Sequence, residues 1–166
     1  RLRGGGAAGR TKSHADEAPV AEWVYVQKDP AEELAQLHYF SIKKLQPEGE
    51  VEFVITVKEF ASRNTVQMRF YAQADKEINQ KIAAFRPFGS GDSLLAALTE
   101  YDQYLSLVDP DSIQASLNKA KADEAGASGP AAEARGKTVQ LLESRLLKFR
   151  KAQEQLELLK AQTQNV

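Results

Sequence analysis

Few residues of this chain have the types and spacing that catalysis requires. The chain has two histidines, His14 and His38, and no cysteine. A lone histidine beside Tyr39 and Phe40 is typical of a structural core residue, and no second metal ligand at helical spacing and no G-x-S-x-G motif accompanies it. The sequence also lacks a Walker loop, a dinucleotide fingerprint and an EF-hand. We therefore expect no enzymatic activity, no cofactor and no bound metal.

One loop has a composition that suits an anion site. Gly89-Ser90-Gly91 precedes a segment with helical periodicity, and free amides at a helix N-terminus can bind phosphate. Asp92 follows directly, and a carboxylate there would accept those amide protons itself and repel a phosphate. The sequence therefore favours a helix cap over a phosphate site.

Aromatic and basic residues on predicted strands suggest RNA binding as an alternative function. Tyr71 could stack on a single-stranded base while Arg69, Lys43 and Lys44 hold the backbone. Residues 21–110 contain 14 acids and 9 bases, a net charge of −5, and this negative charge would repel the phosphate backbone of RNA. RNA binding through this face and the basic ends is therefore the second hypothesis.

The charge is distributed unevenly along the 166 residues. Lys and Arg number 22 and Asp and Glu 23, yet residues 1–15 carry four bases and no acid, and residues 131–166 carry seven bases and four acids. An acidic body with basic ends can bind a partner at its ends. No apolar run approaches the roughly 20 residues of a membrane span, which favours a soluble or peripheral protein, and the lack of cysteine excludes a disulfide-stapled secreted module. We therefore expect a soluble intracellular protein.

The first 20 residues are predicted to form a disordered basic tail. Gly4 to Gly9 contain only glycine and alanine, which cannot bury enough apolar surface to offset the entropy of ordering them. An Arg-rich start without acids also fits the remnant of an organellar transit peptide, which would place the protein in a mitochondrion or chloroplast.

Alternating apolar residues predict a small α+β domain over residues 21–110. Val51 to Val57 and Val66 to Ala74 each place apolar side chains on one face, which is typical of an antiparallel hairpin. Two more segments, Trp23–Gln27 and His38–Leu45, supply further strands, although helix remains an alternative for the second.

The rest of this domain contains one clear helix and two less regular segments. Pro30 favours a helical turn over 31–37, and residues 75–88 are predicted as a loop followed by an edge strand over Ile82–Phe88. Leucines at helical spacing predict a helix over Ser93–Leu107, capped by Asp92, which should cover the apolar face of the sheet. The predicted fold class is α+β: an antiparallel sheet of three to five strands, packed by a helix.

A long amphipathic helix is predicted over residues 131–166, after a short helix and flexible linker over 111–130. About 30 helical residues measure roughly 45 Å, which exceeds the width of a small domain, and the apolar stripe needs a partner for stability. The helix either pairs with another chain, with a coiled coil as one option, or folds back onto residues 112–122 or the sheet.

Pairing with another protein, or with a second copy, is the leading hypothesis. The chain would then be a non-enzymatic interaction or assembly protein, an accessory or structural subunit that docks through its C-terminal helix. The expected contacts are an apolar seam and its flanking bases: Leu142, Leu146, Phe149, Leu156, Leu159, Arg145, Lys148, Arg150 and Lys151.

Overall fold

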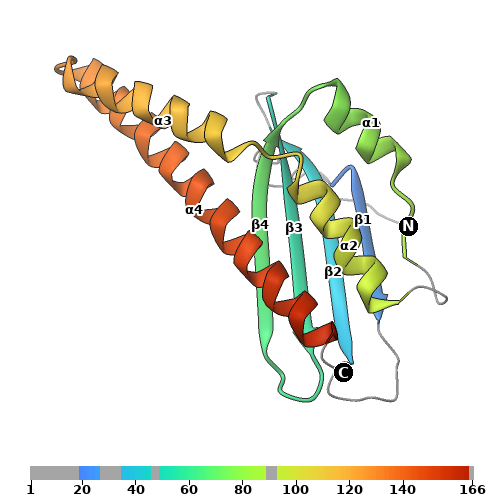
Figure 1. The fold of residues 1–166 in the computed structure, drawn as a ribbon. Coiled ribbons are helices and arrows are strands. Elements are labelled where there is room, and N and C mark those ends of the chain that lie inside the picture. The colour runs from blue at the N-terminus through green and yellow to red at the C-terminus, as the bar shows by residue number, and fades with distance from the viewer. Residues whose placement is uncertain (1–18, 27–34, 46–48, 89–92, 165–166) are drawn as a thin grey trace, which may run out of the picture.

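In the part of the chain that the structure describes, four strands are followed by four helices (Figure 1). The computed structural model describes residues 19–26, 35–45, 49–88 and 93–164, so most of the predicted N-terminal tail lies outside the described residues. The elements are β1 (Ala21–Val26), β2 (Gln36–Leu45), β3 (Glu50–Glu59), β4 (Thr65–Gln73), α1 (Lys76–Ala84), α2 (Leu94–Leu105), α3 (Pro110–Ala125) and α4 (Pro130–Gln164). The predicted α+β class is confirmed.

The strands form one antiparallel sheet in the order β1-β2-β3-β4. The register places Phe40 between Trp23 and Ile55, and Ile55 beside Met68, so one apolar row crosses all four strands. Residues 38–45 are therefore strand and not helix. Because successive side chains of a strand point to opposite faces, this row and its neighbours make one face of the sheet apolar.

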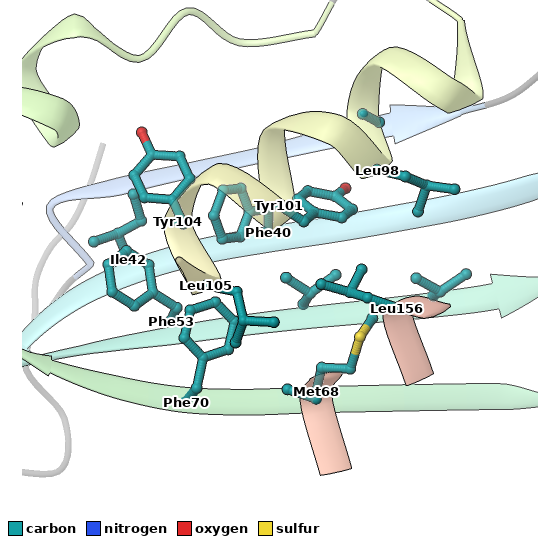
Figure 2. Close-up of a cluster of buried hydrophobic side chains, with 14 of the residues drawn as sticks. Phe40, Ile42, Phe53, Met68, Phe70, Leu98, Tyr101, Tyr104, Leu105 and Leu156 are labelled. Carbon is teal, nitrogen blue, oxygen red and sulfur yellow. The ribbon is translucent and has the colours of Figure 1, made fainter. Parts of the chain in front are cut away.

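The core lies between this apolar face and the helices. Figure 2 shows side chains of the sheet meeting those of α2, with Leu156 of α4 beside them. Ile78 of α1 belongs to the same cluster, so α1, α2 and α4 pack on one face of the sheet. Burying each large apolar side chain stabilises the fold by about 1.5–3 kcal/mol. The labelled core residues are Phe40, Ile42, Phe53, Met68, Phe70, Leu98, Tyr101, Tyr104, Leu105 and Leu156.

The segment after β4 differs from the prediction, because it forms helix α1 rather than a loop and an edge strand. Asp75 caps this helix, with its carboxylate accepting a hydrogen bond from the Ile78 amide at 2.8 Å. Ile78 and Ile82 are one helical turn apart and pack toward the core. The i, i+4 spacing of these two isoleucines outweighed the strand preference of Ile82–Phe88.

Two further predictions concern segments next to the gaps in the described residues. Helix α2 is capped by Ser93, whose Oγ accepts a hydrogen bond from the Ala96 amide at 3.1 Å. The predicted cap Asp92 and the Gly89-Ser90-Gly91 loop lie outside the described residues. The helical turn predicted over 31–37 also lies mostly outside them, and its last two residues belong to strand β2.

Helices α3 and α4 form an antiparallel hairpin that extends past the end of the sheet (Figure 1). Asp109 caps α3 by accepting hydrogen bonds from the amides of Asp111 and Ser112, and Pro110 occupies its first turn. A turn over 126–129 then leads into α4. The segment 111–130, predicted as a short helix and linker, thus consists of most of α3 and this turn.

None of the described helices combines the length with the apolar run that a membrane span needs.

Candidate functional site

The inner side of α4 holds three of the five apolar residues that were predicted to bind a partner. Phe149, Leu156 and Leu159 are buried and belong to the main core with α2 and the sheet. Ala152, where an intermolecular seam would need a large side chain, is 1% exposed, and its small size lets α4 lie close to the sheet. We call Phe149, Ala152, Leu156 and Leu159 the inner stripe. These residues are already packed within the chain.

The other two predicted leucines belong to the helical hairpin. Leu142 and Leu146 are half-buried and pack against a small cluster formed by Leu117, Ala120 and Val139. Both alternatives for a helix that folds back are therefore realised, since α4 contacts α3 over its first half and the sheet over its second.

Arg145 fastens α4 to the edge of the sheet. Its Nε and Nη2 donate hydrogen bonds to the two carboxylate oxygens of Glu50 at 3.1 and 2.8 Å. Its guanidinium carbon lies 3.5 Å from the centre of the Tyr71 ring, and Lys148 Nζ lies 5.6 Å from the same centre. Arg145 therefore forms both a bidentate ion pair and a cation–π contact.

The residues of the RNA hypothesis adjoin this contact. Tyr71 is 8% exposed, and its hydroxyl donates to Glu52 Oε2 at 2.9 Å, the same oxygen that accepts from Arg69 Nη1 at 2.8 Å. Burial and then the charge of Glu52 raise the pKa of Tyr71. Lys43 shares this face, opposite Glu52, whereas Lys44 pairs with a residue of the other face. The ring that would stack on a base is therefore covered by the guanidinium of α4.

His38 lies in a closed polar network within the core. Its Nε2 lies 2.8 Å from Gln36 Oε1 and its Nδ1 2.9 Å from the Tyr101 hydroxyl. A neutral ring that donates from Nε2 and accepts at Nδ1 satisfies both contacts. Burial lowers the pKa of His38 to about 4, and all three side chains are buried. These are the surroundings of a structural histidine.

A groove of about 320 Å³ opens between β4, the junction of α2 with α3, and α4. This volume is within the range of small-molecule sites. Its carboxylates already have partners, since Asp75 and Asp109 cap helices and Glu50 binds Arg145. Within the described ranges, no group of three or more His, Asp or Glu residues could hold a metal ion. The carboxylates of the groove therefore serve the fold.

The outward side of α4 exposes two leucines that sequence analysis did not single out. Leu147 and Leu158 are 55% and 52% exposed, and the exposed residues Lys151 and Glu154 lie between them. Steps of four, three and four residues place all four within about 60° around the helix. We call these four residues the outer stripe. Leu141 is also exposed but lies on a different side of α4.

The outer stripe could be recognised only after the inner one was known. In the sequence, the five larger residues of the predicted seam dominate the helical pattern, and two charged residues interrupt the outer stripe. Comparison with known proteins adds no candidate, since no protein-family model, no curated protein and no solved structure matches this chain.

Proposed function

We propose that this chain is a non-enzymatic interaction protein, an accessory or structural subunit that docks through the outward side of α4. The observation that supports this most directly is the outer stripe, where Leu147 and Leu158 are more than half exposed on a helix whose other side is packed. Single exposed leucines are ordinary, but two on one line of a helix, with charges between them, fit a helix-docking surface.

The support of α4 suits it for this role. Arg145 binds Glu50 of the sheet, Lys160 binds Asp102 of α2, and the inner stripe fills the core between them. The outer stripe is therefore held on a fixed helix before any partner arrives. Because α4 is already ordered, binding of a partner there does not cost the conformational entropy of ordering this helix, a cost that usually weakens association.

The predicted basic residues of α4 divide into two groups. Arg145 and Lys148 contact Tyr71 and belong to the attachment of the helix. Arg150 and Lys151 are exposed. Lys151 belongs to the outer stripe itself, whereas Arg150 lies beside it, where exposed charges influence the choice of partner and the rate of association more than the affinity.

The proposal is tested by changing the outer stripe without disturbing the fold. We expect Leu147→Asp and Leu158→Asp to abolish association in light scattering and in co-purification, because an aspartate would have to be buried at the contact. Leu95→Asp is the matched control, since Leu95 is a 43%-exposed leucine of α2. All three variants should melt near the wild-type temperature. Association that survives both outer-stripe substitutions would contradict the proposal.

A further inference from the structure

We infer that the outer stripe binds the outer stripe of a second copy of this chain, with the two α4 helices antiparallel. This inference rests on the proposed function and specifies its partner. The order of chemical types along the stripe is leucine, base, acid, leucine. Such an order is complementary to its own reverse, which is the requirement for a two-fold contact between identical surfaces.

The pairing follows from the residue numbers. With the two-fold axis between positions 152 and 153, Leu147 of one copy faces Leu158 of the other, and Lys151 faces Glu154. Each of these contacts occurs twice. The stripe therefore forms two leucine layers that enclose two opposite-charge pairs, and the flanking apolar layers exclude water from those pairs.

The spacing matches a helix pair. Steps of four, three and four residues follow the 3.5-residue period at which two helices stay in contact. The next positions of the same line are Ser144 and Ala161, which face each other in this pairing and are small enough to let the helices approach. The contact would run from position 144 to 161, a length of about 25 Å.

The charges select the antiparallel orientation. In a parallel pair with the same stripe in contact, Lys151 would face Lys151 and Glu154 would face Glu154, and like charges at a contact are repulsive. The sheet and α2 permit the pairing, because the outer stripe lies about 150° around α4 from the inner stripe that packs on them. The sheet and α2 therefore stay on the far side of each helix.

Two leucines from each copy make a small interface, below the size of a standard stable complex. We expect a dimer that dissociates on dilution. This sets the conditions of the test, which compares the full chain at several concentrations rather than at one.

Site-specific cross-linking tests the orientation, because the chain has no cysteine to interfere. Leu147→Cys and Leu158→Cys variants, one of them tagged, are treated with a short bis-maleimide singly and as a mixture. We expect the mixed product alone, because equal positions of two antiparallel helices lie about 16 Å apart along the axis. Self-linking of each single variant would instead show a parallel pair and overturn the inference.

Charge exchange tests the pairing of Lys151 with Glu154. Each of Lys151→Glu and Glu154→Lys should weaken self-association at least tenfold, since it creates like-charge contacts on both sides of the axis. An equimolar mixture of the two variants should associate again, because every contact then joins opposite charges. If the mixture and the single variants behave alike, Lys151 does not face Glu154 and the inference is wrong.

The two proposals can fail separately. A wild-type chain that stays monomeric at every concentration in light scattering overturns the second-copy inference. The proposed function fails on a different result, namely that Leu147→Asp and Leu158→Asp leave co-purification of every partner protein unchanged. A third outcome is that the wild-type chain is monomeric but the two substitutions abolish binding of a different protein. The outer stripe would then still be a docking surface, but its partner would not be a second copy.

Discussion

The guanidinium carbon of Arg145 lies 3.5 Å from the centre of the Tyr71 ring, and this contact joins two parts of the chain that sequence analysis assigned to different functions. Arg145 was expected to meet a partner protein, and Tyr71 an RNA base. In the structure Arg145 and Tyr71 instead form a cation–π contact with each other, and Arg145 also forms an ion pair with Glu50. The contact is the point at which α4 is attached to the edge of the sheet.

Loss of this attachment should reduce stability. We expect Arg145→Ala to lower the free energy of unfolding by about 2 kcal/mol, because it removes a two-pronged ion pair and a cation–π contact. Arg145→Lys should have an intermediate effect, since an ammonium group cannot bind both carboxylate oxygens in the same way. Urea denaturation measures both variants.

An exposed ion pair supplies the control for the Arg145 experiment. Lys121 Nζ lies 3.7 Å from Glu143, with both side chains about half exposed. Lys121→Ala should therefore change the free energy of unfolding by less than about 0.5 kcal/mol. Equal losses from Arg145→Ala and Lys121→Ala would contradict the role assigned to Arg145.

Burial of His38 should make stability depend on pH in an identifiable range. The folded-state pKa is about 4 against an ordinary value of 6.5, so between these pH values the unfolded chain binds the additional proton. The contribution of His38 is fully present above pH 6.5, falls as the pH drops toward 4, and levels off below. The total loss is about 3 kcal/mol.

The His38 prediction is checked by denaturation of the wild type and of His38→Gln from pH 3.5 to 7.5. The variant should be less stable at neutral pH, because Tyr101 and Gln36 lose their fitted partner. The difference between the two proteins should shrink as the pH falls below 6.5. A difference that is constant across this range would show that His38 does not titrate with folding.

Two neighbouring leucines of α4 should respond oppositely to truncation. Leu156 is 0% exposed, so Leu156→Ala should cost about 2–5 kcal/mol of stability through the cavity it leaves. Leu158→Ala should cost less than about 1 kcal/mol, because its side chain is half exposed, but it should weaken self-association. Thermal melts and light scattering of both variants separate the two effects.

A substitution at Ala152 tests whether the inner stripe packs on the sheet of its own chain or binds another chain. We expect Ala152→Leu to destabilise the fold by about 1–3 kcal/mol, because a larger side chain must fit between α4 and the sheet. Gln153→Leu, at an exposed neighbouring position, is the control and should leave stability nearly unchanged. If the inner stripe were an intermolecular seam, Ala152→Leu would strengthen association instead.

Local pattern was sufficient for the regular elements. The alternation in Val51–Val57 identified β3, and leucines at helical spacing identified α2 and α4, because both signals come from side chains a few residues apart. Short segments carry a weaker periodic signal. The segment that forms helix α1 was predicted as a loop followed by an edge strand over Ile82–Phe88, since Ile82 and the aromatic residues after it suit either structure in so short a run.

The sequence by itself determined that α4 is a long helix with one apolar side, because helical periodicity depends only on neighbours three and four residues apart. Only the tertiary structure decided what covers that side. An apolar stripe has the same composition whether it meets its own sheet or another chain, and contacts such as Arg145 with Glu50 join residues distant in sequence. The outer stripe could be identified as the exposed side of α4 only because the structure shows the inner stripe packed against the sheet.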